Sequence, residues 1–288
     1  MQLSIKLFLT CLPLLFVINS SAAIKNQTLF INSGTFTTVN NTTFPCFVFN
    51  ETGSFVSLNT VISCTTSDTL VIKIINNDTI IHGFNIKGFS GVNATISPAD
   101  SITDTLTFAA QGLYIYYDEY QYPNYKNMGA GGMICVNNST SKKYYWNLKD
   151  FQSEFNTLIS ENNTVDWTQY NPDYFTINGK SFPDLQNDTT ARVKCNVGDT
   201  IHIFIANTGQ AAHSLHFHGF HCNIIYSNQN HQIGWSKDTF PFRRMDAMVL
   251  ELVPDKIGEY SVHDHNLVAV SGGGIHPNGM FLIMKVEQ

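Results

Sequence analysis

Four histidines in the last third of the chain have a spacing that suits metal binding. They form two His-x-His pairs, His216 with His218 and His263 with His265. Positions i and i+2 of a β-strand point to the same face, so each pair projects two imidazoles together. If the two strands lie side by side, the four imidazoles form one patch, and imidazole suits copper, zinc, iron and nickel. A polar histidine patch without a metal is the alternative interpretation.

A second group of donors lies beside the first. Asp264 separates the two histidines of the second pair, so its side chain points to the opposite face of the strand, toward the interior. Together with His213, His276 and Met280 it offers two imidazoles, a carboxylate and a thioether, which is a donor set for a small copper site. The alternative is a buried Asp264 bonded to His213, with Met280 filling the core, because a buried carboxylate requires a partner.

An internal repeat predicts the elements that position these residues. Four blocks recur in the same order along the chain: 64–72 with 195–203, 82–89 with 213–220, 112–119 with 258–265, and 132–134 with 279–281. Self-similarity of this kind indicates a tandem duplication. The second and third blocks of the later copy contain the histidine pairs, so both pairs belong to one structural unit.

The repeated blocks are short, rich in β-branched residues and bounded by turn residues, which is typical of strands. Many short strands at regular spacing predict an all-β fold of two tandem Greek-key β-sandwiches. We expect a first domain at 24–140, a linker at 141–174 with one short helix near 150–159, and a second domain at 175–288.

The N-terminus predicts secretion. Lys6 precedes an apolar run at 7–18 and a small-residue segment at 20–23, so 1–23 reads as a signal peptide. The apolar run is shorter than the ~20 residues of a membrane-spanning helix, and no later segment could span a bilayer. Ten glycosylation sequons support an extracellular location: Asn26, Asn40, Asn41, Asn50, Asn77, Asn93, Asn137, Asn138, Asn162 and Asn187.

Cysteine usage and charge narrow the function classes further. Removal of the signal peptide would leave five cysteines, an odd number that allows at most two disulfides, whose pairing the sequence does not fix: Cys46, Cys64, Cys135, Cys195 and Cys222. The net charge of −6 argues against nucleic acid as a partner, because there is no basic excess to neutralise phosphates.

With these motifs in view, the chain resembles the multicopper oxidase superfamily, including ceruloplasmin-type ferroxidases, small laccases and copper nitrite reductases. The segment 213–219 is similar to the family's HxxHxHG block, and 263–265 stands where the family has His-Cys-His. Gly279-Met280 resembles its closing Gly-Met, and 265–268 resembles a nitrite reductase segment whose histidine ligates copper across a subunit interface. The resemblance implies two cupredoxin-like domains and copper as the cofactor.

The chain departs from the family pattern at several ligand positions. Asp118 and Asp264 stand where the family has the cysteine of its blue, type 1 copper centre, so that centre is expected to be missing. The domain 1 counterparts of the four histidines are Asn85, Lys87, Tyr117 and Glu119, whereas a trinuclear cluster in this family takes eight histidines from two domains. Only the second domain is expected to bind metal.

Two functions follow from the resemblance and its departures. The favoured one is a secreted copper-dependent oxidoreductase that acts on a small molecule or a metal ion, with Glu119 or Asp264 moving protons. Two-domain relatives imply a homotrimer with a metal site at the interface. The alternative is a non-catalytic extracellular copper-binding or interaction protein that kept the fold.

Overall fold

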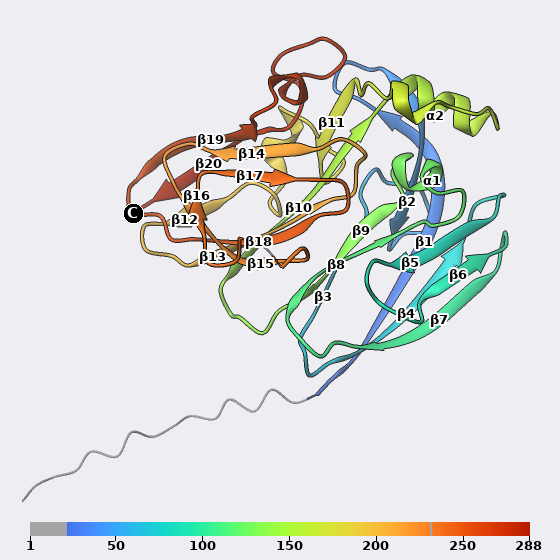
Figure 1. Ribbon diagram of the computed structural model, residues 1–288, viewed down its shortest axis with the longest axis horizontal. Coiled ribbons are helices and arrows are strands. Elements are labelled where there is room, and N and C mark those ends of the chain that lie inside the picture. The colour runs from blue at the N-terminus through green and yellow to red at the C-terminus, as the bar shows by residue number, and fades with distance from the viewer. Residues whose placement is uncertain (1–21, 231) are drawn as a thin grey trace, which may run out of the picture.

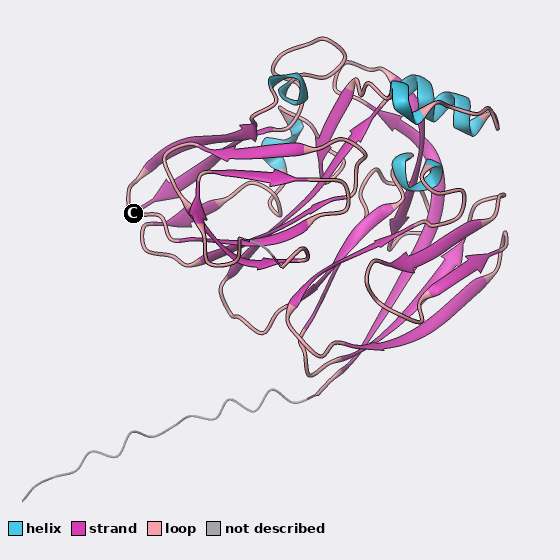
Figure 2. Cartoon of the chain, viewed as in Figure 1, coloured by secondary structure: helices cyan, strands magenta, loops and turns pink. Residues whose placement is uncertain are grey.

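The computed structural model describes residues 22–230 and 232–288, and these form an almost entirely β protein (Figures 1 and 2). The predicted signal peptide lies outside the described residues, apart from its last two. The helices are short: α1 (Asn124–Asn127), α2 (Ser153–Ser160) and three single turns at Trp167–Gln169, Asp184–Asn187 and Leu267–Val270. None of the described helices reaches the length and apolar content that crossing a bilayer requires.

The first domain is a sandwich of two sheets. Sheet A has the strand order β2-β1-β4-β7, and sheet B has the order β3-β9-β8-β5-β6. The strands of sheet A are β1 (Ile24–Thr37), β2 (Thr43–Asn50), β4 (Thr69–Asn76) and β7 (Ser101–Thr107). The strands of sheet B are β3 (Val61–Cys64), β5 (His82–Ile86), β6 (Asn93–Ile96), β8 (Gly112–Tyr117) and β9 (Gly131–Val136).

The second domain repeats this design. Sheet C has the order β11-β10-β13-β18-β15-β16, and sheet D has the order β12-β20-β19-β14-β17. The strands of sheet C are β10 (Lys142–Phe151), β11 (Tyr174–Ile177), β13 (Ile201–Asn207), β15 (Cys222–Ser227), β16 (Ser236–Lys237) and β18 (Ala247–Leu252). The strands of sheet D are β12 (Lys194–Asn196), β14 (His213–Phe217), β17 (Thr239–Phe242), β19 (Gly258–Asp264) and β20 (Phe281–Glu287). The two sandwiches are cupredoxin-like, as expected.

The four sheets stack in the order D, C, B, A, and an apolar layer fills each gap. One core lies between sheets C and D and another between sheets A and B. A third group, which we call the middle layer, joins sheet B of the first domain to sheet C of the second: Leu113, Ile115, Met133, Cys135, Phe204, Ala206, Met245, Ala247 and Val249. Sheets D and A therefore form the two ends of the stack (Figure 1).

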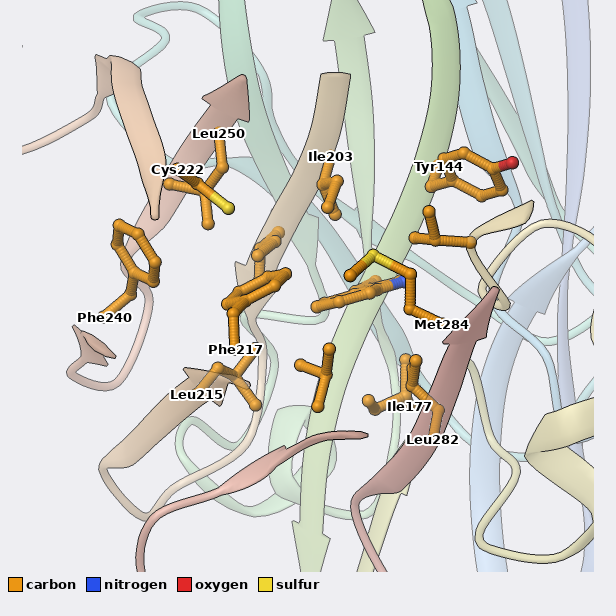
Figure 3. Packing of buried hydrophobic residues seen from close by; sticks show 14 of the residues in the cluster. Tyr144, Ile177, Ile203, Leu215, Phe217, Cys222, Phe240, Leu250, Leu282 and Met284 are labelled. Atoms are coloured by element: carbon orange, nitrogen blue, oxygen red, sulfur yellow. The ribbon is translucent and has the colours of Figure 1, made fainter. Parts of the chain in front are cut away.

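The core of the second domain shows how its sheets are held face to face. Trp146 of sheet C stacks on Phe217 of sheet D, with ring centroids 5.6 Å apart, and both side chains are buried. An aromatic pair of this kind contributes about 0.5–1.5 kcal/mol beyond the burial of its area. Figure 3 shows Phe217 among the aliphatic side chains that surround it. This packing fixes the position of β14, the strand that begins at His213 and contains His216.

The segment expected as a linker is partly structural. Residues 142–151 of it form β10, which pairs in parallel with β13 and antiparallel with β11 inside sheet C. The same relationship joins β1 to β4 in sheet A, so β10 is the second domain's counterpart of β1. Only the rest of the segment, with α2 close to its expected place, connects the domains. The sequence signal was weak here because β10 has three lysines and an aspartate among its ten residues.

The repeat holds for three of the four blocks, and the fourth is out of register. Asp118 and Asp264 are equivalent, and their backbone N–H groups donate to the carbonyls of Ala130 and Met280 respectively. Met280 therefore corresponds to Ala130, whereas the sequence match had aligned it with Met133. The Gly-Met dipeptide occurs in both copies, but at different structural positions.

Candidate metal centre

The two histidine pairs lie on neighbouring strands of sheet D. β14 and β19 are antiparallel, and His216 is paired directly with His263. The backbone N–H of His265 donates to the carbonyl of Ser214, and that of His218 donates to Ser261. Because side chains alternate along a strand, Leu215 and Phe217 enter the core while the four imidazoles project from the outer face of the sheet.

The four rings form one continuous cluster on this outer face, which we call the histidine face. The ring of His216 has its centroid 4.6 Å from that of His218, 5.8 Å from that of His263 and 5.5 Å from that of His265. The centroids of His218 and His263 are 5.0 Å apart. A glycine ends the strand here: Gly219 has a φ of +79°, and a Cβ on it would lie 2.5 Å from the ring of Tyr260.

A backbone carbonyl fixes the tautomer of His263. Its Nδ1 lies 2.8 Å from the carbonyl oxygen of Asp264, which can only accept, so Nδ1 carries the proton. In the neutral ring, Nε2 then has a free lone pair. The Nε2 of His218 lies 2.9 Å from that atom and donates its proton to it. A metal ion would take the place of this proton, with both Nε2 atoms as ligands.

A side-chain relay orients His216 in the same way. Thr239 Oγ1 donates to Asp238 over 3.0 Å, so its oxygen is free to accept from Nδ1 of His216, 2.9 Å away. This leaves Nε2 of His216 unprotonated. Outer-shell partners of this type orient histidine ligands in metal proteins and raise their basicity. The hydrogen bond from Thr239 also lowers the pKa of Asp238, which keeps this carboxylate charged.

The protonation state of the cluster favours metal binding at neutral pH. Partial desolvation and the neighbouring imidazoles of His216 and His263 lower the pKa of His218 below its ordinary value. A metal binds the neutral imidazole, so a lowered pKa keeps this ligand available. A charge on either neighbouring ring would oppose protonation of His218 at these distances.

The donor set fits a metal ion, although the shell is not preassembled. Two nitrogens that are each ~2.0 Å from one ion at a right angle are about 2.9 Å apart, which is the separation of Nε2 in His218 and His263. Among residues 22–230 and 232–288, no group of three or more His, Cys, Asp or Glu side chains is already arranged to hold an ion. A third ligand therefore requires rotation of the ring of His216 or His265, both of which reach solvent.

The second predicted donor set is divided by the structure. Nδ1 of His213 lies 2.6 Å from a carboxylate oxygen of Asp264, and its Nε2 lies 3.4 Å from Asp150. Met280 is fully buried in the core of the second domain. His276 is exposed in the loop between β19 and β20. The structure thus brings together His213 and Asp264 but places the other two donors in different environments.

His213 is a buried cation held by two carboxylates. Burial lowers the pKa of His213, but the hydrogen bonds and charges of Asp150 and Asp264 outweigh this effect and raise the pKa to about 9. Asp264 also accepts from the backbone N–H groups of Ser214 and Asn266. Its carboxylate faces the interior and its oxygens are occupied, so it points away from the histidine face.

The first domain contains the same Asp–His–Asp arrangement. Nδ1 of His82 lies 2.6 Å from Asp118, and its Nε2 lies 3.0 Å from Asp78. Burial lowers the pKa of His82, and its two carboxylate partners raise it above the ordinary value. Asp118 further accepts from the backbone N–H of Gly83 and Tyr120. Each domain therefore has one buried imidazole between two aspartates.

Glu119 and its neighbours lie away from the histidine face of the same chain. The carboxylate of Glu119 accepts from the side chain of Asn85 within the first domain. Nζ of Lys87 donates to the carbonyl of Met245 over 2.6 Å, and Tyr117 packs against the middle layer. Asn85 and Tyr117 belong to sheet B, and Lys87 and Glu119 follow its strands β5 and β8. Sheet C separates sheet B from sheet D (Figure 1).

The structure identifies functional neighbours that pattern reasoning missed. Asp150 is the second partner of His213 but lies 63 positions earlier, so no local motif points to it. Asp78 lies four residues before His82, a spacing that could have drawn attention to it. Thr239 and Asp238 follow a segment without metal-ligand spacing and reach His216 only because β17 pairs with β14.

Comparisons with known proteins agree with this architecture. A model of the multicopper oxidase family matches residues 154–286. A search of curated proteins gave no match. Among solved structures, the chain is similar to the blue copper oxidase from Nitrosomonas europaea, at 20% identity and a TM-score of 0.76 over 91% of this chain and 86% of that one.

Copper nitrite reductases have a similar fold. The enzyme from Nitrosomonas europaea is 17% identical, with a TM-score of 0.72 over 91% of this chain and 94% of that one. The copper-containing nitrite reductase from Thermus scotoductus SA-01 is 18% identical, with a TM-score of 0.71 over 92% of this chain and 62% of that one. At these identities the comparison establishes the shared two-domain fold.

Proposed function

We infer that the chain is a divergent member of the multicopper oxidase superfamily, and we propose that it is a secreted copper-dependent oxidoreductase whose metal site is the histidine face of its second domain. The observation that carries the proposal is the convergence of four imidazoles on the outer face of sheet D. The family match covers residues 154–286, which are most of this domain, and the structures with a similar fold include a blue copper oxidase and copper nitrite reductases.

The ligands of the proposed site have distinct roles. His218 and His263 would supply two nitrogens through Nε2, because their present separation already suits a shared ion. His216 would add a third through its Nε2, which the Thr239–Asp238 relay leaves unprotonated. His265 is exposed and lies close enough to His216 to complete the shell. Bound copper would supply one-electron chemistry and an open position for a small substrate.

The proposed centre differs from a blue copper site because no thiolate is within reach. The family's cysteine position is occupied by Asp118 in the first domain and by Asp264 in the second. Both carboxylates bind a buried histidine instead. All five cysteines among the described residues are free and buried, and none belongs to the histidine face. The protein should therefore lack the intense absorption of a copper–thiolate bond.

Secretion is supported by the apolar run at 7–18 and by the position of the sequons. Several acceptor asparagines are exposed: Asn26, Asn41, Asn77, Asn93, Asn138, Asn162 and Asn187. Asn50 is buried and bonded to Asn32, so it is a poor acceptor. No sequon follows Asn187, so the strands that carry the histidine face contain no N-glycosylation acceptor.

A non-catalytic copper-binding protein is the second candidate function. One observation favours it. In each domain, the position where the family has the cysteine of its type 1 copper centre is an aspartate, Asp118 or Asp264, that is bonded to a buried histidine. An imidazole clamped by two carboxylates has no redox chemistry of its own. Such a protein would bind or carry copper on the histidine face without a partner centre to deliver electrons.

Copper content and paramagnetic resonance test the proposed site. The purified protein should take up copper from Cu(II) in equilibrium dialysis and show the resonance of copper with nitrogen ligands. The double variant His216→Ala/His263→Ala should lose this uptake. The single variant His276→Ala, which removes an exposed histidine of the same domain, is the matched control and should retain it. Unchanged stoichiometry in the double variant would refute the assignment.

Oxygen uptake distinguishes the catalyst from the carrier. The copper-loaded protein is incubated with Fe(II) or a phenol, and oxygen consumption is compared with that of the double variant. Consumption above the variant's background supports the oxidoreductase. Equal rates, with copper bound only by the unsubstituted protein, support the carrier.

A further inference from the structure

We propose that a pocket at the edge of the second domain binds a small carboxylate that also carries hydroxyl groups, the chemical class of the sugar acids and hydroxy acids. The pocket has a volume of about 340 Å³, and three basic side chains, Lys142, Arg192 and Lys194, contribute to its wall. Liquid water occupies about 30 Å³ per molecule, so this space suits a ligand of roughly a dozen non-hydrogen atoms. The inference goes beyond the proposed function, because no residue of the pocket belongs to the histidine face.

The pocket lies where sheets C and D meet the segment that joins β11 to β12. Lys142 is the first residue of β10 in sheet C, and Lys194 is the first residue of β12 in sheet D. Residues 186–189 and Arg192, from the connecting segment, also line it. β12 is an edge strand of sheet D, and β20 lies between it and β19. The pocket is therefore set apart from the strands that carry the histidine pairs.

The three basic side chains have no carboxylate partner of their own. Within residues 22–230 and 232–288, no ion pair includes Lys142, Arg192 or Lys194. Glu287, on the neighbouring strand β20, is bound by Lys285 over 2.5 Å. In a protein with a net charge of −6, three unpaired cations around one pocket make a local positive region that attracts anions.

The acidic residue in the wall does not cancel this charge. Burial raises the pKa of Asp188, but hydrogen bonds from Thr190 and the charge of Lys180 outweigh this effect and lower the pKa below its ordinary value. The carboxylate is therefore ionised, and its Oδ2 lies 3.2 Å from Nζ of Lys180. Because Lys180 neutralises Asp188 and is not itself part of the wall, the charge of the three cations remains.

Two of the cations are held in place by the protein itself. The amino group of Lys142 donates to a backbone carbonyl of β12 and lies 5.6 Å from the ring centroid of Tyr144. Arg192 donates from Nε to the carbonyl of Ile283 over 3.1 Å and from Nη1 to the carbonyl of Gln186 over 3.4 Å. Its Nη2 has no partner among the described residues. A guanidinium that is held in this way presents planar donors that match a carboxylate.

The side-chain amide of Gln186 favours a ligand with hydroxyl groups as well as charge. Gln186 lines the pocket, and its Nε2 and Oε1 are both buried without a hydrogen-bond partner among the described residues. Leaving a buried donor and acceptor unpaired is unfavourable, so a ligand that satisfies both is bound more tightly. A carboxylate or sulfate oxygen can only accept from Nε2, whereas a hydroxyl also donates to Oε1. One ligand with both groups satisfies the amide and the cations together.

A glycosylation sequon stands at the rim of the pocket. Asn187 and Thr189 line the pocket, and Asn187-Asp188-Thr189 is an acceptor sequence for an N-linked sugar. A sugar attached to the exposed Asn187 would stand at the entrance and obscure the binding of a free ligand. Binding is therefore measured on the full-length variant Asn187→Gln, which keeps the three cations and Gln186.

Isothermal titration calorimetry tests the inference. The Asn187→Gln protein is titrated with glucuronate, with glucose, which lacks the charge, and with sulfate, which lacks a hydroxyl. Glucuronate should bind at one site per chain. The dissociation constants for glucose and sulfate should be about tenfold higher or more, as expected when a hydrogen bond to a charged or buried group is lost. Absence of glucuronate binding at millimolar concentrations overturns the inference, and equal affinity for glucose or sulfate overturns the assignment of the ligand class.

Variants assign the binding to this pocket. Arg192→Gln and Lys194→Gln, each in the Asn187→Gln background, should raise the dissociation constant for glucuronate about tenfold, because each removes a charged donor from the wall. Lys73→Gln, which removes an exposed lysine of sheet A, is the matched control and should bind glucuronate as before. The amino group of Lys194 makes no hydrogen bond within the described part of the chain, so this variant preserves the test if Arg192→Gln does not fold. Unchanged affinity in the folded variants would overturn the assignment.

Copper measurements keep this inference distinct from the proposed function. Arg192→Gln should take up as much copper as the unsubstituted protein, and the double variant His216→Ala/His263→Ala should still bind glucuronate. Loss of glucuronate binding in the double variant would show that the ligand coordinates a metal on the histidine face, and it would overturn the pocket. Failure of the unsubstituted protein to bind copper would count against the proposed metal site alone.

Discussion

The Nδ1 atom of His82 lies 2.6 Å from a carboxylate oxygen of Asp118, and the same distance separates His213 from Asp264 in the second domain. Asp118 directly follows β8, which pairs with the strand of His82. Asp264 is the last residue of β19, which pairs with the strand of His213. The second carboxylate comes from outside this strand pair, at Asp78 in one domain and Asp150 in the other. The Asp–His–Asp triad therefore links two neighbouring strands of each sandwich to a third segment outside that strand pair.

The first prediction concerns the pH dependence of stability. The carboxylates raise the pKa of His82 above its unfolded value of 6.5 despite its burial. A raised folded pKa means that the stabilisation is fully present below pH 6.5 and is lost as the pH rises through the folded pKa. The variant His82→Gln should lack this contribution. Urea unfolding should thus show a difference between the two proteins that is largest at pH 6.5 and smaller at pH 9.5.

His213 provides the control for this experiment, because it titrates in both proteins and cancels in the comparison. A difference between unsubstituted protein and His82→Gln that stays constant from pH 6.5 to 9.5 would contradict a titrating His82. Retained far-ultraviolet circular dichroism in the variant is the condition for the comparison.

The second prediction separates structure from metal binding at Asp264. Asp264→Asn removes one charge from a buried triad and should lower the free energy of unfolding by about 3 kcal/mol, in the range for breaking a buried ion pair. Copper uptake at the histidine face should be unchanged, because this carboxylate faces the core. Asp255→Asn at an exposed position is the control. Loss of copper from a folded Asp264→Asn protein would show that the carboxylate belongs to the metal site.

The third prediction concerns the pH dependence of copper uptake. The ligands bind as neutral imidazoles, so uptake should fall as the pH drops below about 6.5, the ordinary pKa of histidine. The depressed pKa of His218 helps this ligand to remain neutral. Equilibrium dialysis from pH 5 to 8 gives the profile. Undiminished binding at pH 5 would point to carboxylate ligands instead.

The fourth prediction concerns the cysteines. All five among the described residues are free and buried, and burial raises the pKa of Cys46 to about 12. A buried thiol with a raised pKa reacts slowly, because the thiolate is the nucleophile. The native protein should therefore resist an alkylating reagent at pH 7.5, while the unfolded protein should take up five equivalents. Mass spectrometry counts the modified thiols, and intact disulfides would contradict the structure.

Much of this architecture could be predicted from the residues themselves. The repeat gave two tandem β-sandwiches, and alternation along two extended segments placed four imidazoles on one face. The alternation of side chains along a strand is a local property of the sequence, so it can be predicted without coordinates. The pairing of His216 with His263 depended only on the strands being neighbours, as the repeated order of the blocks suggested.

Other features depend on contacts that no local pattern encodes. The polar residues of β10 predict a linker, whereas the structure shows a strand paired with β11 on one side and β13 on the other. Asp150 reaches His213 across 63 positions, and Asp238 reaches the histidine face only through strand pairing. The Gly-Met match at the end of each repeat was misleading, because a short similarity between sequences does not fix the register of a strand.

The middle layer has a consequence for how the protein can be handled in the laboratory. Four of its side chains come from the first half and five from the second, and the buried amino group of Lys126 in the first half donates to the carbonyls of Thr208 and Gly209 in the second. Expressing either half alone would expose an apolar sheet face and leave the amino group of Lys126 or its acceptor carbonyls without a partner. Truncated fragments should therefore precipitate, and calorimetry of the intact chain should record one melting transition instead of two.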